Sequence, residues 1–323
     1  MDLKTTLYSV DDRIATITLN RPHRGNAWTG RMHTEYRYLL DQADRDPAVR
    51  AIILTGSGER FCVGGDSQAL DGHSKKGRYD AGTPVDIVTP GRDEFAPFAE
   101  DFAYQFALSK PVIAAINGAA AGVGLVMACY ADIRFAVPGA KLTTAHGPLN
   151  LPAEYGLSWL LPRLIGGARA LELLLSSRKF LTDEAHQIGL VHQLFAPDDL
   201  MRETRAYTAD LVARVSPEAL RQSKRQTYLD FHRDIGMSVR EANDLLSAMV
   251  KQPDYKEAIR AFLDKRPANW GEASTATTED QVGNNAHHTG ALVHLEARLE
   301  EQFEYSRENG DEITDADFVG LSH

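Results

Sequence analysis

Apolar residues alternate with threonines over residues 15–19, near the start of the chain. This period of two predicts a half-buried strand, and the Asn-Arg-Pro sequence after it predicts the end of that strand. A helical period follows over residues 32–43. Residues 51–55 are mostly apolar at consecutive positions and stop at Gly-Ser-Gly, which is typical of a strand buried on both faces. The first part of the chain therefore predicts a strand–helix–strand unit.

The same order of elements recurs further along the chain. A strand is predicted over residues 112–116, a helix through residues 126–130 and a second strand over residues 133–137. Alternating strands and helices are typical of α/β proteins, so the body of the chain is predicted to be α/β. The remaining elements expected are helices over residues 168–176, 182–188 and 198–215, a strand over residues 191–195, and a helix-rich region over residues 217–262.

Three segments have no clear strand or core-helix pattern. Residues 71–94 combine glycines, prolines and mixed charges, which predicts a long mobile loop of the kind that covers a site. Residues 268–290 are rich in Ala, Thr, Gly and Asn, which predicts a linker. Residues 292–307 place apolar side chains at a helical spacing, so this tail is expected either to dock as an amphipathic helix or to be disordered.

The formal net charge of −10 comes entirely from the C-terminal tail. From Gly271 onward the chain has 12 of its 45 acidic residues and only two of its 35 basic residues, which leaves 33 of each sign before that point. A neutral body offers no basic field for nucleic acid, and phosphate and anionic membranes repel an acidic tail. We therefore expect neither nucleic acid nor membranes among the partners.

Cysteine usage and the N-terminus favour a reduced, cytoplasmic environment. Cys62 and Cys129 are too few for a disulfide framework and lie in no metal-ligand spacing, so no metal site is expected. The first residues lack the basic and apolar segments of a signal peptide. The uncharged run over residues 112–130 is rich in Ala and Gly and contains Asn117, so its transfer into a bilayer yields little free energy. We expect a strand, a turn and a helix start there.

Two glycine-containing turns carry the first chemical signal. Residues 61–66 follow a predicted strand, and residues 117–124 precede a predicted helix. Each alone indicates only a tight turn. The second turn lacks the third glycine and the acidic residue of a dinucleotide-binding fingerprint, so NAD binding is not expected.

Together, in this order and separation, the two turns resemble the paired oxyanion loops of the crotonase (enoyl-CoA hydratase/isomerase) family. The resemblance covers about residues 1–268 and adds matches in register. These are NRPHRGNA at residues 20–27, KPVIAAING at residues 110–118, LPRLIG at residues 161–166 and AFLDKRP at residues 261–267.

This resemblance implies a fold, an assembly and a class of reaction. The implied fold is α/β, with a crotonase-like spiral of ββα units over residues 1–200 and a C-terminal helical oligomerisation region over residues 201–268. An acidic linker and tail occupy residues 269–323. The implied assembly is a homotrimer or a dimer of trimers. The implied enzyme is a lyase or isomerase that acts on a small-molecule acyl-CoA, with coenzyme A as part of the substrate and no bound cofactor.

The resemblance places the family's oxyanion donors on the backbone N–H groups of Gly65 and Val123. Electrostatics agrees with the second placement, because Val123 is expected at a helix N-terminus, where free N–H groups and the helix dipole favour negative charge. Two such donors stabilise a thioester enolate. Valine at this position, where many relatives have glycine, keeps the backbone donor and narrows the pocket.

The acid/base residues depart from the pattern of the two-glutamate hydratases. One hydratase glutamate corresponds to Val126 and the other to His146, which puts a paired-carboxylate addition of water in doubt. Glu154 matches, by its spacing to Gly166, the acidic position that dienoyl-CoA isomerases and 4-chlorobenzoyl-CoA dehalogenases use as base or nucleophile. Its apolar neighbours are expected to raise its pKa, which suits a general acid/base near neutral pH. The alternative for Glu154 is a surface carboxylate that caps a helix.

His146 has two interpretations that the sequence leaves open. It is either a packed loop histidine or, since histidine titrates near neutral pH, a group that exchanges a proton with Glu154. A histidine and an acidic residue on this segment also resemble 6-oxocamphor hydrolase, a crotonase relative that cleaves a β-diketone without CoA, although the spacing differs by one residue. Hydrolysis of a C–C bond by His146 and Glu154 is therefore a second hypothesis.

Three basic residues are implied in binding CoA. Arg24 matches the family's basic position beside the nucleotide, and Lys265 and Arg266 match the adenine end, where phosphates need positive charge. The role of Lys265 requires a neighbouring copy of the chain. Asp66 is expected to hold the first oxyanion loop and to take no part in the reaction.

A third hypothesis assigns no reaction to the chain. The missing glutamate at Val126 motivates a catalytically silent, crotonase-fold assembly module whose acidic tail binds a partner.

Overall fold

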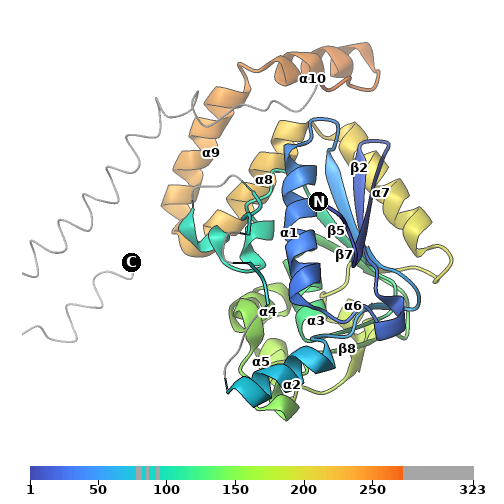
Figure 1. Cartoon of the computed structure of the whole chain (residues 1–323). Coiled ribbons are helices and arrows are strands. Elements are labelled where there is room, and N and C mark those ends of the chain that lie inside the picture. Colours follow the sequence, from blue (N-terminus) through green and yellow to red (C-terminus); the bar gives the residue numbers. More distant parts are fainter. Residues whose placement is uncertain (78–81, 85–86, 92–94, 272–323) are drawn as a thin grey trace, which may run out of the picture. The chain divides into compact units, whose positions relative to one another are not determined.

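The computed structural model describes residues 1–77, 82–84, 87–91 and 95–271 (Figure 1). Residues Met1–Ser274 form one compact unit. The tail helix considered for residues 292–307 and most of the predicted linker lie outside the described residues. The boundary expected at residue 200, between a spiral core and a helical region, stays a prediction.

Strands and helices alternate through the first two thirds of this unit, and helices dominate the rest. The strands are β1 (Thr6–Asp11), β2 (Ile14–Leu19), β3 (Ala51–Gly56), β4 (Arg60–Cys62), β5 (Val112–Ile116), β6 (Ala119–Ala121), β7 (Ile133–Ala136), β8 (Lys141–Thr143), β9 (Phe180–Leu181) and β10 (Gln193–Leu194). The α-helices are α1 (Gly30–Arg45), α2 (Ser67–Lys76), α3 (Val123–Tyr130), α4 (Leu157–Ile165), α5 (Gly167–Ser176), α6 (Thr182–Gln187), α7 (Leu200–Arg214), α8 (Pro217–Leu229), α9 (Ile235–Met249) and α10 (Pro253–Asp264). The 3₁₀ helices are η1 (Pro22–Arg24), η2 (Ala96–Ala99), η3 (Ala103–Gln105), η4 (Gly147–Leu149), η5 (Glu154–Gly156) and η6 (Asp230–His232).

The strands form two sheets, and the chain visits the sheets in turn. The larger sheet has the order β1-β2-β3-β5-β7-β10, parallel except for β1 at its edge. The smaller sheet has the order β4-β6-β8-β9, with β4, β6 and β8 parallel and β9 antiparallel. From β3 to β8, successive strands enter alternate sheets, and α2 and α3 each follow one such pair. The spiral of ββα units implied by the resemblance is therefore present.

Helices cover both faces of the larger sheet. Ile52 and Leu54 of β3 belong to the same apolar cluster as α1 and α3, whereas Ala51 and Ile53 belong to a second cluster with residues of α7. The prediction of a strand buried on both faces is confirmed for residues 51–55.

The prediction of a half-buried strand over residues 15–19 is wrong in its burial, although β2 does form there. Thr16, expected to face solvent, is buried. The reason is α7, which packs on the second face of the sheet and from which Arg205 donates a hydrogen bond to Thr16 Oγ1 (3.4 Å). A polar residue in an alternating pattern is therefore not necessarily exposed to solvent, because a helix distant in sequence can supply its hydrogen-bond partner.

The prediction of a continuous loop over residues 71–94 is also wrong at its start, because α2 extends to Lys76. The Asp66 carboxylate accepts a hydrogen bond from Gln68 N (3.0 Å) and caps the helix, and Gly77 ends it with φ +61°. A capped start and a glycine end stabilise a helix that has only a weak apolar stripe.

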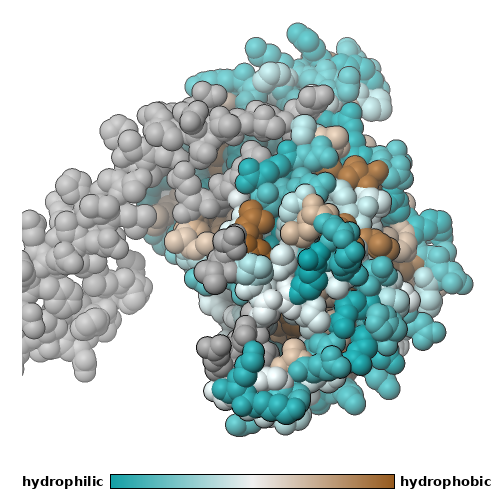
Figure 2. All heavy atoms as spheres, in the orientation of Figure 1, coloured by the Kyte–Doolittle hydropathy of each residue, from teal (hydrophilic) through white to brown (hydrophobic). Residues whose placement is uncertain are grey.

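The last helices differ in how they attach to the sheets. From α8, Lys224 Nζ and the Tyr228 hydroxyl donate to the two oxygens of Asp132, at 2.9 and 2.7 Å. In contrast, α9 and α10 project from the body (Figure 1), and the visible surface over α10 is largely hydrophilic (Figure 2). No helix among the described residues is both long and apolar enough to span a bilayer.

Candidate functional site

The carboxyl ends of three parallel strands position the candidate site. Gly65 follows β4, Val123 follows β6, and His146 follows β8, and these strands are neighbours in the smaller sheet. Carboxyl ends of parallel strands lie along one edge of a sheet, so residues distant in sequence meet there. The structure thus brings together the first three residues predicted for the reaction.

The first loop is held by backbone pairing with the segment before α1. Trp28 N donates to Gly64 O (2.8 Å), and Asp66 N donates to Trp28 O (2.9 Å). In such a parallel bridge the residue between the two bonds, Gly65, directs its own N–H away from Trp28. Among the described residues no acceptor contacts this N–H, so it is available to an oxyanion.

Asp66 fixes this loop from the other side, as expected. Besides capping α2, its carboxylate accepts from Arg21 (3.0 Å) and Arg24 (3.4 Å). Burial raises the pKa of Asp66, but the hydrogen bond from Gln68 N, the hydrogen bond from Arg21 and the two guanidinium charges outweigh burial and hold this pKa below its usual value. Asp66 is therefore an ionised structural anchor.

The second loop ends at Val123, the first residue of α3. Gly122 precedes it with φ +48°, and its carbonyl accepts the first helical hydrogen bond from Val126 N (3.0 Å). The N–H of Val123 has no acceptor within the part of the chain that the structure describes. It lies at the positive end of a buried helix, as predicted.

The two loops are in contact, and a carboxylate lies beside them. A Cβ atom built on Gly64 would lie 3.2 Å from Ala121 O. One built on Gly122 would lie 3.8 Å from Gly64 Cα and 3.8 Å from Glu154 Oε2. Three segments that are separate in sequence therefore converge within a few ångströms, which brings Glu154 close to the predicted oxyanion donors.

Glu154 lies in η5, and its surroundings favour the protonated acid. Burial raises the pKa of this carboxyl, and the electrostatic effect of His146 opposes burial only in part. The expected direction of the pKa shift is confirmed. The alternative of a helix-capping carboxylate is not supported, because neither η5 nor α4 has a side-chain cap. A carboxyl that takes up a proton more readily than usual suits proton transfer near neutral pH.

His146 is buried, with 7% of its surface exposed, and lies just before η4. Its Nδ1 atom is inaccessible and has no hydrogen-bond partner among the described residues. A buried polar atom without a partner is costly, so packing alone does not account for this histidine. Together with its electrostatic effect on Glu154, this favours a role at the site.

Val126, at the position of a hydratase glutamate, packs into the apolar core with 1% of its surface exposed. The helix α3 therefore contributes no carboxylate to the site. Cys62 and Cys129 are likewise buried, and burial raises the pKa of each thiol to about 12, which leaves both without a nucleophilic role. No group of three or more metal-ligating side chains occurs in the described part of the chain.

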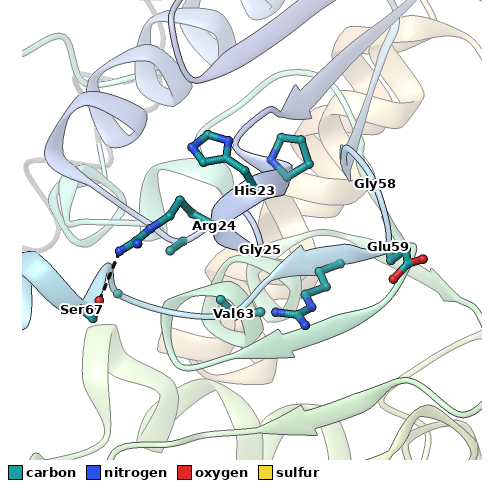
Figure 3. Close-up of a pocket in the computed structure, with 11 residues that line it drawn as sticks. His23, Arg24, Gly25, Gly58, Glu59, Val63 and Ser67 are labelled. Atoms are coloured by element: carbon teal, nitrogen blue, oxygen red, sulfur yellow. Dashed lines mark hydrogen bonds between the residues drawn. The ribbon is translucent and has the colours of Figure 1, made fainter.

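A cavity of about 620 Å³ opens beside Gly65 (Figure 3). Arg24 lies at its edge, where its guanidinium donates to Ser67 Oγ (3.3 Å), and 39% of this side chain is exposed. The lining also includes His23 and Arg60, for which the sequence alone indicates no role in binding. Their signal in the sequence is weak, since His23 fills a variable position of its motif and Arg60 is the first residue of a strand of only three residues.

Lys265 and Arg266 do not join this site within one chain. Neither lines the cavity, and Figure 1 shows the end of α10, where they lie, far from α2. Arg266, two residues past the end of α10, instead pairs with Glu257 of that helix at 2.6 Å. In a single chain, the cavity lining thus includes Arg24 but neither Lys265 nor Arg266, which are predicted to bind the adenine end of CoA.

A second cavity, of about 550 Å³, lies beside the Glu154 loop. Its wall is mostly aromatic and includes Tyr130, Tyr155 and Trp159, together with Phe98 of η2 and Phe106, which follows η3. Tyr155 and Gly156 belong to both this wall and η5.

Known proteins share this sequence and this fold. The enoyl-CoA hydratase/isomerase family matches residues 9–273. A 1,2-epoxyphenylacetyl-CoA isomerase of Escherichia coli is 33% identical over 80% of this chain and 95% of its own, and a crotonyl-CoA hydratase of Syntrophomonas wolfei is 29% identical over 84% and 99%. The crystal structure of an enoyl-CoA hydratase from Bacillus anthracis covers 84% of this chain and all of its own, with a TM-score of 0.72 and 26% identity.

Proposed function

Because the chain belongs to the enoyl-CoA hydratase/isomerase family, we propose that it is an enzyme of the lyase/isomerase class that acts on an acyl-CoA thioester. The thioester carbonyl oxygen accepts hydrogen bonds from the N–H groups of Gly65 and Val123. The observation that carries this proposal is the convergence of Gly64, Gly122 and the Glu154 carboxylate.

The two N–H groups act on the charge that develops when the substrate loses a proton next to the thioester. The resulting enolate places negative charge on the carbonyl oxygen, where fixed donors stabilise it without reorganisation. The N-terminus of α3 adds the favourable end of the helix dipole. Losing one such donor typically reduces the rate roughly 100-fold to 1000-fold.

Glu154 is the group that moves the proton. With Val126 in the core, the site has one carboxylate where the two-glutamate hydratases have two. A single carboxylate is sufficient for isomerisation, since it removes a proton from the carbon next to the carbonyl and returns it two carbons further along the enolate. The proposal therefore favours shift of a double bond over addition of water.

Arg24 and the cavity beside Gly65 are the proposed site of the CoA nucleotide. The cavity adjoins Gly65. Its lining has the guanidinium groups of Arg24 and Arg60 against the single carboxylate of Glu59, so positive charge is available for phosphates. Since Lys265 and Arg266 lie away from the cavity of their own chain, we assign them to the cavity of a neighbouring copy. This assignment is one reason to propose a homotrimer or a dimer of trimers.

Replacement of Glu154 by glutamine tests the assignment. In Glu154→Gln, kcat should fall by roughly 1000-fold, whereas Glu203→Gln, at a partly exposed carboxylate on α7 that pairs with Arg202, should match the wild type. The wild-type profile of kcat/KM should lose activity as the pH falls through a value above 4.5, because burial raises the pKa of Glu154 and protonation removes the base. The assay follows conjugated absorbance over a panel of enoyl-CoA esters. Unchanged turnover of the folded glutamine variant would disprove the role of Glu154.

A second candidate function has support from the unpartnered Nδ1 of His146. His146 and Glu154 together activate a water molecule that attacks one carbonyl carbon of a β-diketone. The bond from that carbon to the carbon between the two carbonyl groups then breaks, so the attacked carbon becomes a carboxylic acid. The electron pair of the broken bond forms an enolate of the other carbonyl, held by Gly65 and Val123, which takes up the proton lost by the water. Turnover of cyclic β-diketones that is lost in His146→Asn, with no binding of CoA esters in calorimetry, would favour this function over the first.

A further inference from the structure

One helix connects the two parts of the proposed site. Val123, with the free N–H, is the first residue of α3, and Tyr130 is the last. The Tyr130 hydroxyl donates a hydrogen bond to the carbonyl of Tyr155 (2.7 Å), the residue directly after Glu154. A helix rises about 1.5 Å per residue, so these two ends are held roughly 10 Å apart by a rigid element.

The loop that Tyr130 holds has an unusual backbone. Tyr155 has φ +50° and ψ +40°, and Gly156 follows with φ +71°, so two consecutive residues are left-handed. A residue other than glycine adopts this conformation only when its surroundings impose it. The hydrogen bond from Tyr130 is one such constraint, and the ring of Phe102, 4.9 Å from that of Tyr155, is another.

Tyr130 itself is well fixed. Its ring is buried and packs 5.0 Å from Phe106. Burial raises the pKa of its hydroxyl to about 12, with a smaller contribution from Cys129, so it remains a donor at every pH used in an assay. At Gly156 an added Cβ atom would approach this hydroxyl to 3.0 Å, which shows how closely the loop fits against it.

We propose that Tyr130 is a positioning residue for Glu154. Its hydroxyl holds the Tyr155 carbonyl and thereby sets the place of the carboxylate relative to the Val123 N–H on the same helix. This inference rests on the proposed role of Glu154 and adds the device that aligns the proton-moving group with the oxyanion donors. Misplacement by about 1 Å is enough to slow such chemistry severely.

The variant Tyr130→Phe removes only the hydroxyl, and Tyr36→Phe is its matched control. Tyr36 is also fully buried and donates to a neutral acceptor, Gln105 Oε1, at 2.8 Å. Both variants should lower Tm by similar amounts. In Tyr130→Phe, kcat for the best ester of the enoyl-CoA panel should fall at least 10-fold with KM within twofold, and in Tyr36→Phe both should stay within twofold. Wild-type kcat in Tyr130→Phe would overturn the proposal.

A second measurement separates this inference from the proposed function. Infrared titration of the ligand-free protein, as the difference between each protein and its Glu154→Gln partner, reports the Glu154 carboxyl without any turnover. Releasing the loop exposes this carboxyl, so its midpoint in Tyr130→Phe should move at least half a pH unit toward that of an ordinary glutamate. An unmoved midpoint overturns the positioning role, even if Glu154→Gln is inactive. A moved midpoint supports that role, even if Glu154→Gln retains activity and the proposed function fails.

Discussion

Gly122 shows how much a single residue contributes to this site. It turns the chain into α3 at φ +48°, and any side chain on it would enter the space between Gly64 and the Glu154 carboxylate. The positive φ angle requires glycine at this position, and the proposed chemistry requires the space that a side chain would fill. At other glycines of the chain only the φ angle requires glycine, so the two effects can be measured separately.

Replacement of Gly122 by alanine should therefore affect activity more than stability. Gly139 is the matched control, since it has φ +72° in a turn and no atom within 4 Å of an added Cβ atom. Both alanine variants should lose about 1–2 kcal/mol of unfolding free energy in urea titrations. Only Gly122→Ala should lose kcat/KM, by roughly 100-fold. Equal activity of the two variants would show that the Gly122 position is remote from the reacting atoms.

Among the elements, the N-terminal strand depends on α1 through one buried carboxylate. Glu35 accepts hydrogen bonds from the N–H groups of Lys4 and Thr5, from the hydroxyls of Thr5 and Thr6, and from Arg31. Burial by itself raises the pKa of Glu35, but these donors outweigh it and lower the pKa to about 2. The ionised side chain thus fastens β1 to the helix.

Loss of that charge should destabilise the protein at neutral pH. Glu35→Gln should lower the unfolding free energy by about 2 kcal/mol, whereas Asp41→Asn, in the solvent-facing ion pair with Arg45 on the same helix, should change it by less than about 0.5 kcal/mol. Because the folded pKa is depressed, the stabilisation is complete above pH 4.5 and declines as the pH falls toward 2. Urea titrations at pH 7 and pH 3 check both points, and a difference that grows on acidification would contradict the account.

Several of the longer elements are those that the sequence predicts, although α2 and β1 are not among them. The strands β3, β5 and β7 and the helices α1, α5 and α7 form within two residues of their expected ends, because their apolar patterns are long enough to reveal a period. The smaller sheet has strands of two or three residues, too short for any pattern, and it is the sheet that carries the site. The proposed donors and Glu154 follow only from the order of motifs and stay predictions. Tyr130 does not follow from that order, since its proposed role depends on a carbonyl 25 residues away.

At the scale of the whole molecule, exposed apolar side chains of the described residues are concentrated on the last two helices, α9 and α10. Phe262 and Leu263 of α10 are 81% and 70% exposed, and several apolar side chains of α9 are also exposed. Clusters of this kind on a soluble surface usually mark an interface. The proposed assembly covers them with a second copy of the chain, which the proposed role of Lys265 in a neighbour's cavity also requires.

A charge on this surface should separate the copies. Phe262→Asp should reduce the mass in light scattering from that of three or six chains to that of one, and it should raise KM for the CoA ester if Lys265 serves a neighbour. Leu175→Asp, at a leucine of α5 that is 77% exposed, is the matched control and should leave the mass unchanged. A wild-type protein that is already a monomer would refute the proposed assembly.

The row of parallel strand ends has a consequence for how such a chain diversifies. The loops after β4 and β6 contain the N–H groups proposed to hold the anion, while the segment after β8 contains His146 and Glu154. The loops proposed to bind the intermediate and the segment proposed to determine its reaction are therefore separate in the sequence. On this proposal, mutation or grafting within residues 144–156 alters the reaction and leaves the two loops proposed to bind the anion unchanged. A library confined to those thirteen positions searches for new activities without rebuilding the fold.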